Sequence, residues 1–552
     1  MAPTFPKPSS SSLRPWQGIT PFRFAWTAFI VLATSAPYLF GWLSTPPGFH
    51  YTWILPPYPE DSFAYMSWSR QSAFGAWLFK IKYTALPHQA FLFNPFFLVC
   101  GWISSIFSGN IGIVFLVVKA MGVILFFMAF YKYADYLGLG VSQSIAASLL
   151  LGVSSGFGGI LILAGQGRFI SRMSADLWMP EINTYWSLLS NPLYPFSLTL
   201  MLLSIYWLDR GTREGYPSDI WLSGLSTGGM ALIHPYSQPV LLSLAVTLIV
   251  ARRRSEAEGY LCRFFAAALP ALLYVVFADI SNGIVRAHSA LGEMDSPPVY
   301  AYILGLGFPL LLCIPGLIAA PRTLLKRYWP LILWFSLSIV LAYFPFWFQR
   351  KLLFGAHIPL CIVAGASCGT IVDGYLSKSK HRWLPVVVAV ICLPLVASTA
   401  ICLAIKDRRE IAQNKDGSYF ISDDVMRGLE FLRARKAPQE VVFADYMTSR
   451  FIPAYSGNTV VWGHWAQSVD LAERQKWWSG LLNPQFDGND RDRLYGFWGT
   501  DIEFVFADGE LKQQLETDPS RWRFILIGST KVFEDASVGI YQRPASLPTP
   551  HD

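Results

Sequence analysis

Long apolar runs separated by short polar stretches dominate this sequence of 552 residues. A helix needs about 20 apolar residues to cross the hydrocarbon core of a bilayer, and runs of that kind recur from Ala25 to Leu403. Because a chain in lipid must satisfy its own backbone hydrogen bonds, and a helix does so within one segment, the pattern predicts a polytopic helical membrane bundle. We expect about 11 to 13 embedded segments. The candidates are 25–44, 90–107, 111–131, 142–164, 192–208, 219–234, 238–251, 264–280, 301–320, 329–347, 353–372 and 384–405.

Clusters of Lys and Arg indicate which side of the membrane each polar stretch faces, because short basic loops stay in the cytoplasm. Such clusters lie at 252–254, 322–327 and 378–382, and the expected segments alternate consistently between them. The Ser/Pro-rich residues 1–24 then form a cytoplasmic tail. The stretches expected to face outward are 45–89, 165–190, 281–300, 348–352 and everything after residue 406.

The front of the chain contains one apolar run too many for this alternation. With the N-terminal tail inside, 45–89 lies outside, and three apolar runs separate it from the outward stretch 165–190. An odd number of crossings ends on the opposite side of the membrane, so three full crossings cannot connect two stretches that both lie outside. The run 90–107 contains Asn94 and Pro95 and is the most interrupted, so we expect it to be re-entrant or to lie along the membrane surface.

Residues 406–552 differ in character from the rest, because charged helical patterns alternate there with short runs of β-branched and aromatic residues. That alternation predicts a small soluble α/β domain on the outer side of the membrane. Ser422, with two acidic residues behind it, predicts the start of a helix. Neither a GxGxxG nor a P-loop pattern is present, so nothing supports nucleotide binding. The predicted strands lie near 440–444, 458–462, 502–507 and 523–527.

Composition agrees with a membrane protein and excludes other classes. Hydrophobic residues make up 53% and charged residues only 14%, against about 25% charged in soluble domains. The net charge of +7 is modest, and no basic stripe interleaved with aromatic residues is present, so we expect no nucleic-acid partner. The seven cysteines lie in or beside apolar runs, without a CxxC motif, and are interpreted as small core residues.

Glu60 and Asp61 are the strongest local signal for chemistry. They precede an aromatic amphipathic stretch that can lie at the membrane surface. Adjacent carboxylates there cost free energy unless they are solvated or used. Such a group can accept a proton from an attacking hydroxyl or amine, or hold a divalent cation together with other oxygens. In the structural alternative, Asp61 and Ser62 cap the helix that follows.

The outward stretch 165–190 is the second candidate, because Asp176 and Glu181 stand there between aromatic residues. They are further acid or metal candidates, as the second wall of a polar cavity. The alternative is an interfacial loop that Trp178 and Trp186 anchor to the membrane.

Arg350 and Lys351 are the third candidate, because they stand on the outward end of a helix, against the usual distribution of positive charge. Arg binds phosphate through a bidentate fork and Lys through a point charge. A lipid phosphate or pyrophosphate is the natural ligand. The alternative is that both side chains snorkel to lipid headgroups.

The histidines show no metal-binding spacing such as HxxxH, so structural roles are favoured for His88, His234 and His357. His464 and Trp465 follow a predicted strand in a glycine-containing run. That run is either a turn or a ligand contact, and the turn is favoured.

Together these features resemble the GT-C superfamily of lipid-dependent glycosyltransferases, which includes protein O-mannosyltransferases, lipid A aminoarabinose transferases and oligosaccharyltransferase catalytic subunits. The resemblance is in the layout of residues 25–405: one helix, a long outward loop with an acidic motif near its start, juxtamembrane helices, and many further helices. Many members also end in an outward soluble domain. No DxD, WWD-type or DNE-type signature is present, so metal dependence stays open.

The resemblance also implies roles for individual residues. Asp61, or less readily Glu60, matches the catalytic Asp of the first outward loop. Asp176 matches, loosely, a second outward acidic site, and Arg350 matches a late basic residue that contacts the lipid phosphate.

The function implied by the resemblance is transfer of a sugar from a polyprenyl-phosphate donor to a glycan, lipid or protein acceptor on the extracytoplasmic face of a bacterial inner membrane. The alternatives are a transporter or flippase of lipid-linked saccharide, and a non-catalytic scaffold that displays its tail. Transporters usually carry inverted repeats and helices broken at the midplane, and no repeat is evident.

Overall fold

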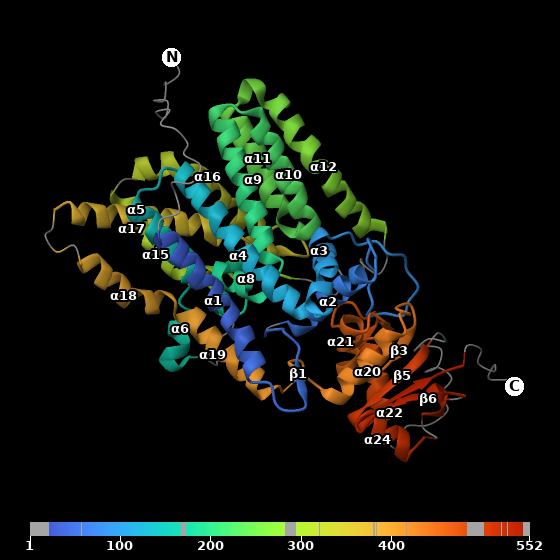
Figure 1. Ribbon diagram of the computed structural model, residues 1–552. Helices are drawn as coiled ribbons and strands as arrows, with labels where there is room; N and C mark the ends of the chain where they lie inside the picture. The colour runs from blue at the N-terminus through green and yellow to red at the C-terminus, as the bar shows by residue number, and fades with distance from the viewer. Residues whose placement is uncertain are drawn as a thin grey trace.

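The computed structural model shows a helical bundle with a smaller α/β unit at one end (Figure 1). The tail expected at 1–24 and the outward stretch expected at 281–300 fall largely outside the described residues. Of the basic cluster at 378–382, the structure describes Lys378 and His381. The described residues are 21–56, 58–166, 173–281, 294–319, 321–378, 381, 383–415, 417–482, 502–519, 522–526 and 528–544.

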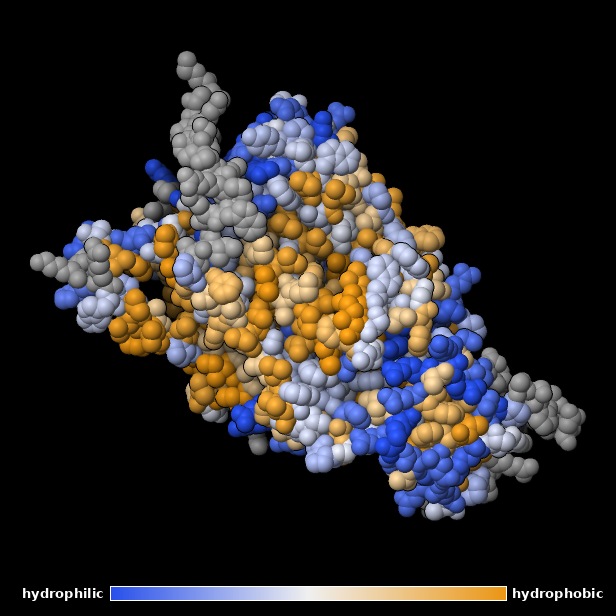
Figure 2. Space-filling model, viewed as in Figure 1, coloured by the Kyte–Doolittle hydropathy of each residue, from blue (hydrophilic) through white to orange (hydrophobic). Residues whose placement is uncertain are grey.

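Each predicted membrane segment coincides with a helix or with a bent pair of helices. Within the described residues, five helices are long and apolar enough to cross a membrane, and up to eight crossings result if each bent pair counts as one. Apolar side chains form a broad band over the bundle, and polar side chains gather on the α/β unit and at the opposite tip (Figure 2). The chain is an integral multi-pass membrane protein. The other bundle helices are α1 (Pro21–Leu43), α4 (Ile111–Tyr136), α9 (Tyr194–Glu214), α10 (Pro217–Ile233), α11 (Gln238–Arg252), α12 (Ala257–Ser281), α16 (Pro321–Leu341), which is kinked at Tyr328, and α17 (His357–Leu376).

Three of the predicted segments are each broken in two, which the apolar pattern did not predict. The helices on either side of the breaks meet at 53°, 81° and 47° in chain order. The pairs are α5 (Val141–Val153) with α6 (Gly158–Leu161), α14 (Val299–Gly305) with α15 (Gly307–Ala319), and α18 (Leu384–Val396) with α19 (Ser398–Gln413).

The first two breaks lie against each other. The backbone N–H of Phe157 donates to the carbonyl oxygen of Leu304 at 2.8 Å. A Cβ atom added to Gly156 would lie 2.0 Å from that oxygen, so only glycine permits this approach. Backbone groups that leave one helix are thus satisfied by the other, which is how membrane proteins tolerate non-helical backbone at depth.

The run expected not to cross the membrane, 90–107, contains the short helix α3 (Pro95–Ile103) and the 3-10 turn η1 (Ser104–Phe107). At 1.5 Å per residue these elements span about 20 Å, less than the hydrocarbon core of about 30 Å. Asn94 caps α3 by accepting a hydrogen bond from the N–H of Phe96 at 3.0 Å. A capped helix of this length agrees with the prediction that 90–107 does not cross the membrane.

The C-terminal unit contains a five-stranded sheet in the order β4-β3-β5-β7-β6, in which β3 runs parallel to β4 and β5 and the other pairs are antiparallel. The predicted helix start is confirmed, because Ser422 Oγ accepts from the N–H of Val425. Its strands are β3 (Val441–Phe443), β4 (Thr459–Val460), β5 (Ile502–Asp508), β6 (Thr530–Glu534) and β7 (Val538–Gln542), and its helices include α20 (Asp423–Ala434), α21 (Tyr446–Tyr455), α22 (Leu471–Leu482) and α24 (Gly509–Thr517).

The strand predicted at 523–527 is wrong. That run contains the short helix α25 (Arg523–Leu526), and the hairpin β6–β7 that follows completes the sheet instead. An apolar run this short does not distinguish helix from strand. The edge strand β6 is largely exposed and polar, so no apolar run in the sequence indicates it.

The two ends of the bundle carry different contacts. At one end β1 (Phe49–Tyr51), from the first outward stretch, pairs antiparallel with β2 (Phe420–Ser422) of the C-terminal unit. At the other end the expected cytoplasmic stretches meet. Arg252 Nη1 lies 2.6 Å from Asp209 Oδ1, and Arg327 Nη2 donates to the carbonyl of Leu137 at 2.9 Å. The predicted alternation thus brings each set of loops to its own end.

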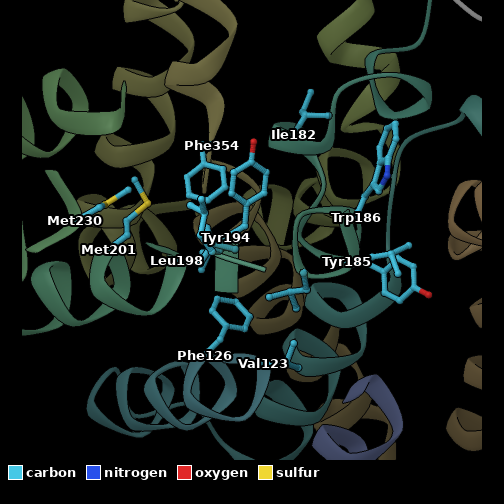
Figure 3. Close-up of a cluster of buried hydrophobic side chains, with 14 of the residues drawn as sticks. Val123, Phe126, Ile182, Tyr185, Trp186, Tyr194, Leu198, Met201, Met230 and Phe354 are labelled. Atoms are coloured by element: carbon cyan, nitrogen blue, oxygen red, sulfur yellow. The ribbon is translucent and has the colours of Figure 1, made fainter. Parts of the chain in front are cut away.

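Buried apolar side chains fill the bundle between these ends. Phe126 of α4 points toward Leu198 of α9, and Met201 of α9 lies beside Met230 of α10 (Figure 3). Tyr194 and Phe354 continue this cluster, with ring centroids 4.9 Å apart. Tyr194 also lines the cavity described next, so the bundle core supports one wall of the site.

Candidate active site

A narrow cavity at the end of the bundle next to the C-terminal unit collects residues from five separate parts of the chain. Its volume is about 50 Å³, room for only a few water molecules. Five of the six predicted site residues lie in or beside it, and Asp176 does not. The residues that line it include Tyr58, Asp61, Tyr65, Glu181, Ser190, Tyr194, Arg350, Lys351 and Trp465.

Asp61 lies in the first turn of α2 (Pro59–Ala73), with Pro59 at the start of the helix. The residue before the helix is Tyr58, in the left-handed conformation at φ 70°, and no side chain caps the helix. The alternative in which Asp61 and Ser62 cap the helix is therefore wrong. A carboxylate in a first helical turn is still favoured by the helix dipole, and that position turns Asp61 into the cavity.

The C-terminal unit holds the Asp61 carboxylate. Trp465 Nε1 donates to Asp61 Oδ1 at 3.1 Å, and His464 Nε2 lies 3.4 Å from the same oxygen. Burial alone would raise the pKa of Asp61, but the contacts with His464 and Trp465 outweigh it and lower this pKa below its usual value. Asp61 is thus ionised near neutral pH.

His464 is fixed by the turn that the sequence predicted. Its Nδ1 atom accepts hydrogen bonds from the backbone N–H groups of Ala466 at 3.0 Å and Gln467 at 3.2 Å. Because Nδ1 accepts two hydrogen bonds, the ring proton sits on Nε2, on the side of Asp61. His464 is thus built to donate to the carboxylate.

Glu60 faces away from the cavity and joins α2 to the C-terminal unit. It accepts from the N–H of Trp465 at 2.7 Å and from the hydroxyl of Tyr446 at 3.1 Å. Its Oε1 atom lies 2.7 Å from Nη2 of Arg450, and both side chains are largely buried. All three partners belong to the C-terminal unit, so Glu60 joins this unit to α2 beside Asp61.

The opposite wall of the cavity carries a buried ion pair. Lys351 Nζ lies 2.6 Å from Glu181 Oε1 and 3.5 Å from the hydroxyl of Tyr194. Burial favours a raised pKa for Glu181, but the charges of Lys351 and Arg350 outweigh it and lower this pKa. The predicted second acid thus serves as the counter-ion of the predicted phosphate-binding lysine.

Several polar atoms around the cavity lack a hydrogen-bond partner among the described residues. They are Nε of Arg350, Oε2 of Glu181 and Oγ of Ser190. The guanidinium of Arg350 otherwise lies over the ring of Trp178, with 5.8 Å between its Cζ and the ring centroid. Buried polar groups in proteins are nearly always paired, so this wall is suited to a polar ligand or to bound water.

Asp176 lies outside the cavity. It is fully buried and accepts from Thr399 Oγ1 at 2.6 Å and from the hydroxyl of Ser174. A Cβ atom on Gly158 would lie 2.6 Å from its Oδ1 atom, so the carboxyl fills the break between α5 and α6. Burial raises the pKa of Asp176 to about 6.

No group of three or more His, Cys, Asp or Glu side chains within the described residues has the geometry of a metal site. Sequence reasoning did not place Tyr58, Tyr65, Ser190, Tyr194 or Trp465 in the site. Of these, Trp465 stood in a run that the sequence singled out, but a turn was favoured there. Its contact with Asp61 spans 404 positions along the chain.

Comparison with known proteins gives no match to a family model and none to a curated protein. Solved structures do match. AftD, an arabinofuranosyltransferase from Mycobacteria, superposes with a TM-score of 0.51 at 14% identity, over 94% of this chain and 40% of that one. The chain thus spans less than half the length of AftD.

Two further matches come from other organisms. The archaeal oligosaccharyltransferase AglB from Archaeoglobus fulgidus, in complex with an inhibitory peptide and a dolichol-phosphate, has a TM-score of 0.49 at 12% identity, over 96% of this chain and 76% of that one. ArnT from Cupriavidus metallidurans, bound to undecaprenyl phosphate, has a TM-score of 0.47 at 13% identity, over 95% and 99%. These structural neighbours are GT-C glycosyltransferases, and this chain has the GT-C fold.

Proposed function

We propose that this protein is a glycosyltransferase that moves a sugar from a polyprenyl-phosphate donor to an acceptor on the extracytoplasmic side of the membrane. The observation that carries the proposal is the meeting, in one cavity, of an ionised carboxylate, Asp61, with the basic pair Arg350 and Lys351. A lipid-borne donor requires a cation at the membrane surface for its phosphate and a base near the sugar. The fold supports the proposal, because AftD, which shares it, is an arabinofuranosyltransferase.

In the proposed reaction Arg350 binds the donor phosphate, because it forms no ion pair with a carboxylate among the described residues, whereas Lys351 is paired with Glu181. An oxygen or nitrogen of the acceptor attacks the anomeric carbon of the donor sugar. The new bond forms at that carbon while its bond to the phosphate oxygen breaks, and the lipid phosphate leaves with the electron pair. Asp61 takes the proton of the attacking group. Because the cavity is narrow, its walls must part to admit the phosphate.

The orientation is part of the proposal. Residues 406–552 face the extracytoplasmic side, and the protein resides in a bacterial inner membrane. Support comes from the C-terminal unit contributing Trp465 to the same cavity as the outward stretches, and from the basic clusters meeting at the opposite end. Alkaline phosphatase fused after residue 414, beyond the end of α19, is expected to be active. An active cytoplasmic reporter at that junction would reverse the orientation.

The experiment that tests the function compares lipid-linked sugars and envelope glycans of a deletion strain with those of the complemented strain. An extracytoplasmic transferase predicts that one polyprenyl-phosphate sugar accumulates on the outer leaflet, where periodate added to intact cells oxidises it, while one glycan loses that sugar. Accumulation only on the inner leaflet would indicate a flippase instead. Unchanged lipids and glycans would indicate a scaffold and overturn the proposal.

A further inference from the structure

A second cavity, of about 650 Å³, lies in the C-terminal unit and shares no lining residue with the first. Cavities of roughly 300–1,000 Å³ commonly hold small organic ligands. Its lining includes acidic and aromatic side chains. The acidic residues are Asp445, Asp508 and Glu510, and the aromatic ones include Tyr446, Phe420 and Trp478.

The cavity lies where α/β sheets usually bind ligands. Strands β3 and β5 are neighbours and run parallel. Asp445 stands two residues beyond the end of β3, and Asp508 is the last residue of β5. Each is followed at once by a helix, α21 or α24. Ligands of open α/β sheets bind outside the carboxyl ends of the strands, so the topology itself brings these two carboxylates to the binding edge.

The two carboxyl groups are held in different ways. Asp445 Oδ1 accepts from the backbone N–H groups of Met447 at 2.8 Å and Thr448 at 3.1 Å, which caps α21. Its Oδ2 atom is buried, and no N–H, alcohol or phenol group among the described residues donates to it. Asp508 Oδ1 accepts from the hydroxyl of Thr448 at 2.9 Å.

Asp508 holds its proton more tightly than an ordinary aspartate does. Burial, and then the charge and hydrogen bonding of Asp445, raise the pKa of Asp508 well above its usual value. A carboxyl group beside a carboxylate offers one hydrogen-bond donor and several acceptors close together. That set matches vicinal hydroxyl groups, each of which can donate and accept.

We propose that this cavity binds a sugar ring of a glycan. The hydroxyl groups of the sugar form hydrogen bonds with Asp445 and Asp508, and its C–H faces pack on the aromatic rings. That this glycan is the acceptor of the transferred sugar rests on the proposed function, whereas its binding does not. The link to the first site is Tyr446, which lines the second cavity and donates its hydroxyl to Glu60 at 3.1 Å, next to Asp61. A glycan held here is therefore connected to the catalytic loop through α21.

The test is binding of the full-length protein, in lipid nanodiscs, to an array of immobilised bacterial and synthetic oligosaccharides. Wild type is expected to bind at least one glycan. Asp508→Asn keeps the shape but leaves no carboxyl–carboxylate pair, and it is expected to weaken that binding at least tenfold. Glu516→Gln, an exposed position on α24, the helix that follows Asp508, is the matched control and is expected to bind as wild type does. Thr448→Val, which removes the hydroxyl that holds Asp508, is expected to weaken binding several-fold even if Asp508→Asn does not fold.

Two results would overturn the site: no glycan bound by the wild-type protein, or equal binding by wild type and both cavity variants. The same array separates this inference from the proposed function. An Asp61→Asn protein is expected to bind the glycan normally. If a protein shown to lack transferase activity still binds the glycan, the second cavity remains a glycan-binding site and only its role in transfer is refuted.

Discussion

His464 Nε2 lies 3.4 Å from Oδ1 of Asp61, although the two residues come from opposite ends of the chain. The backbone turn that occupies Nδ1 of His464 leaves its ring proton facing the carboxylate. The helix bundle supplies the acid, and the C-terminal unit supplies the groups that keep it ionised. The site is thus incomplete without the C-terminal unit.

His464→Asn should raise the pKa of Asp61. The side-chain oxygen of Asn can accept the hydrogen bonds of the turn, as it does in Asx turns, but it does not reach the carboxylate. In the wild type the pKa of Asp61 is lowered, so transfer falls only when the pH drops through that low value. In the variant the acid limb of the kcat/KM profile moves to higher pH. Trp465→Phe, which removes the indole donor, should move the limb in the same direction.

A profile whose acid limb stays in place in both variants would mean that Asp61 is not the group that titrates in the reaction. A uniform loss of activity at every pH, without a moved limb, would mean that His464 only stabilises the turn.

Arg350→Ala should weaken donor binding far more than folding. A hydrogen bond to a charged group contributes about 1.5–3 kcal/mol, so the donor Kd should rise roughly ten- to hundredfold. Arg350→Lys should rescue only in part, because the fork geometry is lost. Arg433→Ala, on the surface of the C-terminal unit, is the control. Titration of the purified protein with undecaprenyl phosphate, followed by native mass spectrometry, measures the effect. An unchanged Kd in Arg350→Ala would support simple snorkelling instead.

Asp176→Asn should stabilise the protein at neutral and alkaline pH without abolishing transfer. Burial raises the folded-state pKa of Asp176 to about 6, above the usual value of 3.8. The folded protein therefore binds a proton that the unfolded chain has released. Stability falls as the pH rises from about 4 to about 6, and the loss persists above that range. Asn keeps an acceptor for Thr399 and carries no charge.

The difference in Tm between the Asp176→Asn variant and wild type should therefore be small near pH 4 and grow toward pH 7. Detergent-solubilised protein in a thermal melt series provides the measurement. If the Asp176→Asn variant lost transfer activity but kept normal stability, Asp176 would have a role in the reaction.

The sequence was informative about which end of the molecule each residue occupies. Alternating crossings, read from the basic clusters, place Asp61, Glu181 and Arg350 in outward stretches, and the structure brings all three to one cavity. Any residue in those stretches shares that end, so this success follows from topology alone. It does not require knowledge of how the loops pack.

Side-chain packing determines which partner each acidic residue has, and the sequence alone did not predict those partners. Asp176 and Glu181 are five positions apart in one outward stretch, yet one fills a helix break and the other pairs with Lys351. Glu60 and Asp61 are adjacent, yet Arg450 takes one and His464 the other. Each outcome depends on a partner distant in sequence, and no local pattern encodes it.

Asp61→Asn is the substitution that bears most directly on the mechanism. Asp61 is not a helix cap, so the variant costs no capping hydrogen bond. It removes a charge from the first turn of α2, which changes stability by only about 0.3–1 kcal/mol. The amide can still accept from Trp465. Expression and donor binding should therefore stay normal, whereas transfer should fall at least about a hundredfold, because general-base help is typically worth about 10²–10⁴.

Glu60→Gln separates the two neighbouring acids. Glu60 faces Arg450 and Tyr446, so its loss should lower the Tm and loosen the C-terminal unit, with a smaller effect on transfer at temperatures where the protein stays folded. Single-turnover assays with purified variants, at one donor concentration well above the Kd, distinguish chemistry from binding. Near-wild-type transfer by Asp61→Asn would place the base elsewhere. If Glu60→Gln also remained active, the chemistry would have to lie outside α2, with the wall formed by Glu181 and Lys351 as the next place to search.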